Sequence, residues 1–254
     1  MSDRAGRDSR QRLRNPAFLQ AALLRERDAD AVEEMDKPGA DPAMLDRTYA
    51  QFPLVNRVVS RWHGVYRQRI RPLLSPTRTA TLLDIGCGGG DIPAALARWA
   101  VRDGLPLRIT AIDPDPRAIA YATAHHAGTG VEFRLAHSGA LAAAGEGFDV
   151  VISNHMLHHL SPQEMVGLMA DSALLARRLA LHSDIARSPI AYALFAAGTV
   201  PFFPGSFIRR DGLTSIRRSY TSTELRAVLP AGWHVEPARP WRTLALFTPG
   251  AGHA

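Results

Sequence analysis

The sequence has only one cysteine, Cys87, one lysine, Lys37, and no apolar run long enough to cross a bilayer. A single cysteine excludes an internal disulfide and fits a reducing compartment. A membrane-spanning helix needs about 20 consecutive apolar residues, so we expect no stable membrane insertion. Residues 1–16 also lack the apolar stretch of a secretory signal. These absences together predict a cytoplasmic protein.

The net charge of +6 comes almost entirely from arginines that are dispersed along the chain. A net positive charge alone would suggest nucleic-acid binding. The densest cluster of arginines lies within residues 1–16, where aspartates interrupt it. We therefore interpret residues 1–16 as a disordered basic arm and expect no nucleic-acid partner.

Residues 17–76 have helical character and predict a helical cap. A first helix is expected over residues 17–35, ending before the sequence KPG, and a second follows residues 40–42. Apolar residues recur there at spacings of three and four, which is typical of an amphipathic helix. Pro53 lies inside this stripe and can begin a new helix there.

From residue 80 strand-like and helix-like segments alternate, which predicts a parallel sheet covered by helices. Strands are expected at 81–85, 107–113, 131–136, 148–153, 177–185, 233–238 and 242–248, and helices at 92–103, 116–126, 162–176 and 221–229. The fold class is therefore α/β, with a Rossmann-like, doubly wound, seven-stranded and mostly parallel sheet. Residues 77–254 form this domain, and residues 186–219 are an insertion that breaks the alternation.

The sequence TLLDIGCGGGDIP, residues 81–93, places four glycines between an expected strand and an expected helix. Gly86, Gly88 and Gly90 have no Cβ, so a ligand can approach their backbone closely. Asp91 is suited to cap the following helix, and Pro93 fits its first turn. A tight turn without any ligand is the alternative interpretation.

Two familiar nucleotide motifs are absent from this loop. The dinucleotide fingerprint G-x-G-x-x-G fails because Asp91 stands at its last position, and no G-K-[ST] follows. Asp84 precedes the first glycine, and a carboxylate there repels a pyrophosphate but attracts a cation. Asp113 ends the next strand, where its carboxylate can accept both hydroxyls of a ribose. The segment SNHMLHHL, residues 153–160, follows a third strand end and contributes Asn154 and His155.

The sequences DIGCGGGD, AIDPD and FDVVISNHMLHHL together resemble class I S-adenosylmethionine-dependent methyltransferases over residues 80–185. The resemblance implies S-adenosylmethionine as the cofactor and these cofactor-binding residues: Asp84, Gly86, Gly88, Gly90, Asp113 and Pro114. The family often has an acid after the third strand, which contacts the adenine. This sequence reads AHSGA there, so Ser138 is the expected substitute. Asn56, in the cap, is either satisfied by the backbone or reaches the cofactor.

The reaction expected from this resemblance is methyl transfer to a small acceptor. A neutral hydroxyl must lose its proton, and histidine suits that task near neutral pH. We therefore predict His158 or His159 as the catalytic base, although either can simply pack or hydrogen-bond. The spacing H-x-x-H-H also allows a metal site. No carboxylate or cysteine stands beside it in the sequence, so we predict no metal.

The acceptor is expected to contact the insertion. It supplies Phe195 in an apolar stretch, and Arg210, Arg218 and Tyr220 in a basic one. The cap and the sequence RRDG…RRSYT resemble a bacterial subgroup associated with quinol and phenolic-lipid methylation. This resemblance implies O-methylation of a phenol or hydroquinone-like metabolite. The alternatives are N- or C-methylation, a non-catalytic cofactor-binding protein and a nucleic-acid methyltransferase, although its usual N-P-P-Y-like segment is absent.

Overall fold

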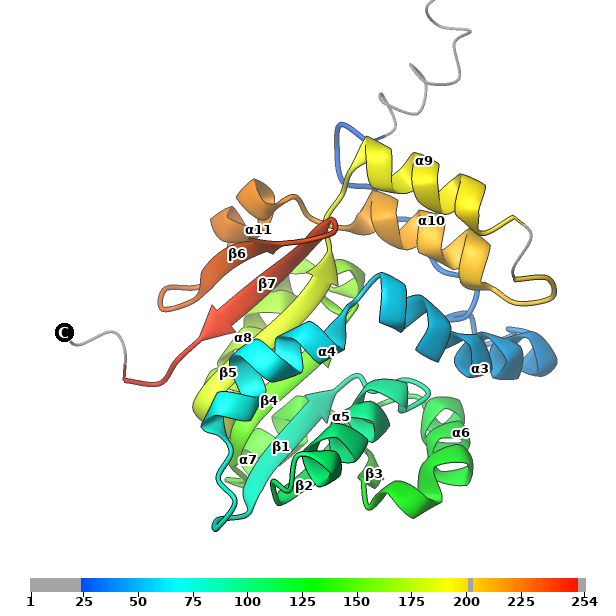
Figure 1. Ribbon diagram of the computed structural model, residues 1–254. Helices are drawn as coiled ribbons and strands as arrows, with labels where there is room; N and C mark the ends of the chain where they lie inside the picture. The colour runs from blue at the N-terminus through cyan, green and yellow to red at the C-terminus, as the bar shows by residue number, and fades with distance from the viewer. Residues whose placement is uncertain (1–23, 201–202, 251–254) are drawn as a thin grey trace, which may run out of the picture.

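The computed structural model describes residues 24–200 and 203–250, and their central element is a seven-stranded sheet (Figure 1). The strands are β1 (Ala80–Ile85), β2 (Leu107–Asp113), β3 (Glu132–Leu135), β4 (Phe148–Asn154), β5 (Ala176–Ile185), β6 (His234–Ala238) and β7 (Arg242–Phe247). Their order is β3-β2-β1-β4-β5-β7-β6, and β7 runs antiparallel to the other six strands. The predicted α/β fold with a mostly parallel sheet is confirmed.

Helices cover both faces of the sheet, as the alternating sequence predicts. They are α5 (Asp91–Arg102), α6 (Pro116–His126), α7 (Ser138–Ala143), α8 (Pro162–Leu175) and α11 (Ser222–Val228). On one face, α5 packs with the segment 62–70 against residues such as Leu82 and Val150. On the other, α7, α8 and α11 pack around Val151 and Ala180. Because β1 and β4 are buried on both faces, their near-continuous apolar sequences are explained.

The N-terminal part of the chain differs from the prediction. Residues 24–41 form turns and extended segments instead of the second half of a helix over 17–35, and residues 1–23 lie outside the described part. Helix α3 (Pro42–Val58) continues through Pro53, so no new helix begins there. The chain instead bends at Arg61, which has a left-handed backbone (φ 48°), before the short helix α4 (Trp62–Val65).

The insertion at 186–219 forms two helices, α9 (Pro189–Gly198) and α10 (Ile208–Arg218). They lie side by side above the carboxyl end of the sheet, next to α3 (Figure 1). The sequence predicted an interruption here but not a pair of helices, since the stretch is rich in glycine and proline around residues 198–205. None of the helices within the described residues has the length and apolar character to span a membrane.

Candidate functional site

A cavity of about 940 Å³ lies at the carboxyl ends of β1, β2 and β4. Parallel α/β sheets bind ligands at this edge, where the strand order reverses between β1 and β4. Its lining includes eight of the residues predicted to bind the cofactor: Asp84, Gly86, Gly88, Asp113, Pro114, Asn56, Asn154 and His155. His158, His159 and Phe195 also line it. Residues from three sequence motifs and from the cap therefore border the same cavity.

Two hydrogen bonds to the neighbouring strand fix the conformation of the glycine loop. The backbone N–H groups of Gly86 and Cys87 donate to the carbonyl of Ile112 at 2.8 and 3.0 Å. Gly86 and Gly88 have positive φ angles of 71° and 51°, which favour glycine. No atom lies within 4 Å of the position that a Cβ on Gly88 would take. Gly88 therefore leaves free space for a ligand against the backbone.

Gly90 serves packing and not the cavity. It is absent from the lining, and a Cβ there would lie 2.8 Å from the ring of Phe133. Its φ of 80° places it just before α5, so Gly90 and not Asp91 is the N-cap residue. The prediction that Gly90 contacts the cofactor thus does not match its position. Gly89 lines the cavity instead.

Asp84 is a buried carboxylate with an unsatisfied atom. It is 1% exposed, and its Oδ1 has no hydrogen-bond partner within the described residues. Burial, with the charges of Asp91 and Asp113 nearby, raises the pKa of Asp84 well above its usual value. A cationic ligand would supply the missing partner, as the sequence predicts for this position.

Asp113 both shapes the loop and faces the cavity. Its Oδ2 accepts the N–H of Gly88 at 2.9 Å, and its Oδ1 accepts the N–H of Asp115 at 2.9 Å. Burial raises the pKa of Asp113, while these two hydrogen bonds act in the opposite direction. A carboxylate oxygen has two lone pairs, so each can still accept a ligand hydroxyl.

A chain of hydrogen bonds ties the cap to the glycine loop and to β4. Asn56 donates from Nδ2 to Oδ2 of Asp91 at 3.0 Å and accepts at Oδ1 from the hydroxyl of Ser60 at 2.7 Å. Ser60 also lies 3.0 Å from Nε2 of His155. Burial lowers the pKa of His155 to about 4, so its ring is neutral near pH 7. Asn56 is thus satisfied mainly by side chains and still borders the cavity.

Ser138 does not reach the cavity. It is the first residue of α7, and its hydroxyl donates to Asp171 of α8 at 2.7 Å. Ser138 is absent from the cavity lining, so the expectation that it recognises adenine does not match its position. Pro114 does line the cavity, beside Asp113.

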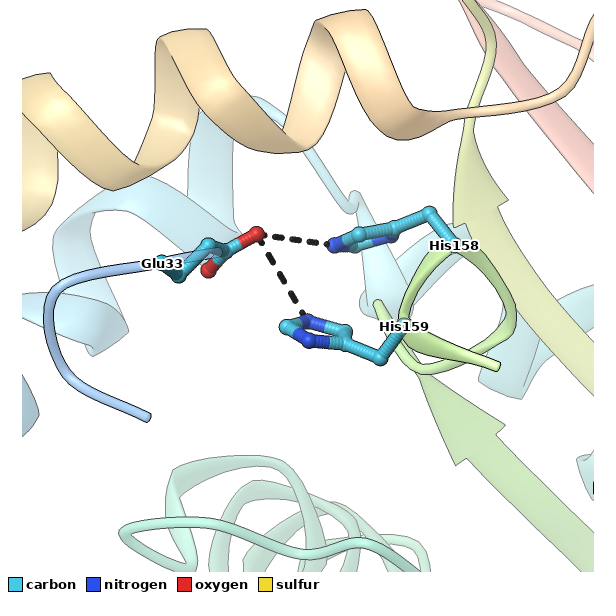
Figure 2. A group of neighbouring side chains, drawn as sticks. All are labelled: Glu33, His158 and His159. Carbon is cyan, nitrogen blue, oxygen red and sulfur yellow. Dashed lines mark ion pairs between the residues drawn. The ribbon is translucent and has the colours of Figure 1, made fainter. Parts of the chain in front are cut away.

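His158 and His159 meet a carboxylate that the sequence did not reveal (Figure 2). Oε1 of Glu33 lies 3.3 Å from Nε2 of His158 and 3.7 Å from Nε2 of His159. Asp184, at the end of β5, lies 2.7 Å from Nδ1 of His158, and Asp36 lies 3.0 Å from Nδ1 of His159. Glu33 is about 125 positions away in the chain, so no local spacing indicates this cluster.

The carboxylates determine the charge of this cluster. Burial opposes a charged His158, but Asp184 and Glu33 outweigh it and raise the pKa of His158 to about 9. Burial likewise opposes a charged Glu33, and its ion pair with His158 and the charge of His159 nevertheless lower its pKa to about 2. In this arrangement His158 is protonated at neutral pH and is a weak base.

Helix α10 fixes the segment that carries Glu33. The two oxygens of Asp211 accept the N–H groups of Glu34 and Met35 at 2.8 and 3.0 Å. Ser215, one turn later, donates its hydroxyl to Oε1 of Glu33 at 2.7 Å. The insertion therefore positions a cavity residue from the N-terminal segment.

The predicted substrate-binding residues divide into two groups. Phe195 of α9 lines the cavity, but Arg210, Arg218 and Tyr220 do not. Arg218 is buried, and its guanidinium donates to the carbonyls of His158 and His159 at 3.2 and 3.1 Å. Tyr220 is packed in the core beside Arg27. Arg218 therefore supports the histidine turn from outside the cavity, and Arg210 is exposed.

Much of the remaining wall is apolar. Leu54 and Val58 of α3, Leu194 of α9 and Trp241 line the cavity and are also between 39% and 64% exposed. Exposed apolar side chains that border a cavity are typical of a mouth that admits an apolar ligand. We call these four residues the apolar rim.

One domain match and two solved structures show what this chain is similar to. Residues 82–177 match the family model described as "Methyltransferase domain". The fold is similar to that of the plantazolicin methyltransferase BpumL in complex with SAH, with a TM-score of 0.52 at 14% identity, covering 81% of this chain and 95% of that one. A putative O-methyltransferase from Nostoc punctiforme has a TM-score of 0.51 at 12% identity, covering 78% of this chain and 59% of that chain. Residues 82–177 of this chain are therefore similar in sequence to a methyltransferase domain, and the fold is one that these methyltransferases share.

Curated relatives give a more particular similarity. The chain is 34% identical over 140 residues to the ubiquinone biosynthesis O-methyltransferase of Methylobacterium sp. (strain 4-46), covering 54% of this chain and 52% of the relative. It is 32% identical over 125 residues to the protein of the same name from Cereibacter sphaeroides (strain KD131), covering 48% of each. The chain thus spans about half the length of the curated relatives it matches.

Proposed function

We propose that this protein transfers a methyl group from S-adenosylmethionine to a hydroxyl oxygen of a small aromatic acceptor, a phenol or hydroquinone-like metabolite. One observation carries this proposal: the glycine loop, the strand-end carboxylates and the paired histidines border one cavity. The names of the curated relatives favour oxygen as the methylated atom. We also propose that residues 77–254 form the catalytic domain, that 186–219 is its insertion and that 17–76 is a cap.

The residues of the cofactor half fit the proposed ligand. Asp84 has an unpaired oxygen for the ammonium group, and Gly88 has open space beside its backbone. Asp113 has lone pairs for the ribose hydroxyls, with Pro114 beside it for the adenine. When bound, the cofactor supplies a methyl group that its sulfonium makes electrophilic.

The other half of the cavity suits an apolar ring that carries a hydroxyl. Phe52 and Phe195 supply aromatic walls, and the apolar rim continues them outward. The histidine cluster is the polar group available to the hydroxyl. His159, which is 28% exposed, is the better candidate for the base, because Asp184 and Glu33 together raise the pKa of the buried His158 and keep it protonated. Holding the two reactants in line contributes about 7–11 kcal/mol to such reactions.

Calorimetric titration with S-adenosylmethionine and S-adenosylhomocysteine tests the cofactor half. We expect micromolar binding, and we expect Asp113→Ala to weaken it at least about 30-fold, because hydrogen bonds to a charged group contribute roughly 1.5–3 kcal/mol each. Asp115→Ala is the matched control, since the Asp115 side chain caps α6, pairs with Arg117 and does not line the cavity. Equal affinity of the Asp113→Ala variant and the original protein would contradict the ribose assignment.

Incubation with catechols, hydroquinones and phenols of increasing alkyl length, followed by mass spectrometry, tests the acceptor half. We expect methoxy products and a KM that falls as the alkyl chain lengthens. Products methylated on nitrogen or carbon would contradict O-methylation and support N- or C-methylation instead. Cofactor binding without turnover on any small acceptor would instead favour a non-catalytic role.

A further inference from the structure

The histidine cluster has the composition and geometry of a metal site. We propose that Glu33, His158 and His159 bind a divalent transition-metal ion such as zinc, with open coordination positions that face the cavity. The spacing H-x-x-H-H, from His155 to His159, allows a metal site, but the sequence predicts no metal because no carboxylate stands beside it. In the structure His155 bonds to Ser60, and Glu33 takes the third position.

The three ligand atoms are spaced for one ion. All lie within 4.8 Å of one another, and Oε1 of Glu33 is 3.3 and 3.7 Å from the two Nε2 atoms (Figure 2). Direct N–H···O hydrogen bonds usually span about 2.7–3.2 Å. A tetrahedral zinc with bonds of about 2.0–2.1 Å holds its ligands about 3.3 Å apart. Both separations are long for hydrogen bonds. The separation from His158 matches this edge, and the separation from His159 is longer than it.

The surroundings of the two histidines fix them as ligands. Asp184 holds Nδ1 of His158 at 2.7 Å, and Asp36 holds Nδ1 of His159 at 3.0 Å. A carboxylate on the far nitrogen is the usual support of a metal-binding histidine, because it sets the tautomer and orients the ring. With Nδ1 of each ring donating to its carboxylate, both neutral histidines would carry the Nε2 lone pair toward Glu33, where an ion can bind.

An unsatisfied buried atom independently points to a ligand here. Nε2 of His158 has no hydrogen-bond partner of good geometry, and the side chains of His158 and Glu33 are only 1% and 5% exposed. A buried polar atom without a partner is costly. An ion at the centre of the cluster would satisfy this nitrogen. Two imidazoles and one carboxylate suit zinc and its first-row neighbours rather than magnesium or calcium, which prefer oxygen ligands.

Bound metal changes the roles of the histidines. Both Nε2 atoms would be ligands, so neither could accept a proton. An acceptor hydroxyl would bind the ion as a further ligand and release its proton to solvent, since a coordinated O–H is more acidic. This last step rests on the proposed function, whereas metal binding itself does not.

Metal titration of the untagged full chain, freed of metal by a chelator, tests the proposal. We expect stoichiometric binding of Zn²⁺ in calorimetry, and a visible d–d absorption with Co²⁺ whose intensity indicates four- or five-fold coordination. Zn²⁺ should also raise the melting temperature, because the ion binds the folded state. Asp36→Asn should weaken binding about 10–100-fold, as expected for a residue that supports a ligand.

Two ligand variants and one control make the test specific. Glu33→Gln and His159→Asn should each weaken Zn²⁺ binding by more than Asp36→Asn does. His234→Asn, at an exposed histidine of β6, should bind Zn²⁺ as the original protein does. Binding of S-adenosylhomocysteine by each variant shows that it is folded. Absence of Zn²⁺ and Co²⁺ binding, or unchanged binding by both ligand variants, would overturn the metal site.

The same samples separate this proposal from the proposed function. Cofactor binding by the metal-free protein, without any binding of Zn²⁺ or Co²⁺, would overturn the metal site alone. Metal binding without cofactor binding would overturn the methyltransferase proposal alone. Turnover that a chelator abolishes and Zn²⁺ restores would support both, while turnover unaffected by the chelator would show that the metal does not activate the acceptor.

Discussion

Asp184 holds His158 by two groups at once. Its Oδ1 lies 2.7 Å from the ring nitrogen Nδ1, and its Oδ2 accepts the backbone N–H of the same residue at 2.8 Å. One carboxylate on β5 therefore sets both the position of the turn after β4 and the orientation of the ring. Asp184 is buried behind the histidine and acts through it.

The Asp184→Asn variant should lower kcat about 10–100-fold, the usual cost of losing a support behind a functional histidine. Cofactor affinity should change little, because Asp184 does not line the cavity. The two are measured by steady-state kinetics and calorimetry. A larger loss of cofactor affinity than of kcat would contradict the positioning role.

The Asp84→Asn variant should be more stable and bind the cofactor less well. The raised pKa of Asp84 means that its charged form destabilises the folded protein as pH rises above the usual aspartate range. Removing an unpaired buried charge should raise the free energy of unfolding by about 1–3 kcal/mol at pH 7. Thermal unfolding and calorimetry measure the two effects. An unchanged affinity for the cofactor would show that Asp84 does not contact it.

Gly88→Ala should mainly weaken cofactor binding, whereas Gly90→Ala should mainly lower the free energy of unfolding. Gly90→Ala should lower the free energy of unfolding by about 2–4 kcal/mol, through the clash with Phe133 and the positive φ. Gly88→Ala should lower the free energy of unfolding by only about 1 kcal/mol, through backbone strain. Its methyl group would, however, occupy space that a ligand needs. Urea unfolding and cofactor titration compare the pair. A greater loss of affinity in Gly90→Ala than in Gly88→Ala would contradict these assignments.

His182 should make stability depend on pH. Burial on β5 lowers the pKa of His182 to about 3, against an unfolded value of about 6.5. The unfolded chain therefore binds the extra proton, so the stabilisation is complete above pH 6.5 and decreases as pH falls toward 3. Below pH 6, His182→Gln should reduce the slope of the unfolding free energy against pH by about 1.4 kcal/mol per pH unit. Urea unfolding between pH 5 and 7 measures this slope, and an unchanged slope would contradict the prediction.

The sheet could be predicted closely because its strands are buried on both faces. The expected strand at 107–113 coincides with β2, and that at 177–185 differs from β5 by one residue. The expected helix at 17–35 is wrong over residues 24–35, since tertiary contacts hold that segment in turns. The carboxylate of Asp211 in α10 accepts two of its backbone N–H groups, and hydrophobic periodicity in the sequence does not indicate such contacts.

The candidate site was predictable where it follows strand ends and not where it depends on distant contacts. Asp84 and Asp113 stand at the ends of β1 and β2, and both line the cavity. Ser138 was misassigned because the next helix begins there and turns its hydroxyl toward α8. Glu33 was missed because only the folded chain brings it to the histidines.

The two hydrogen bonds from the backbone of Glu34 and Met35 to Asp211 restrict the route by which ligands can enter the cavity. Moving this segment aside would break two hydrogen bonds to a carboxylate, each of which contributes roughly 1.5–3 kcal/mol. Ligand exchange past the N-terminal segment would therefore be slow. The apolar rim offers a passage that breaks no such bond among the described residues. A lipophilic acceptor would thus enter between α3 and α9 and meet the histidines at the far end of its path.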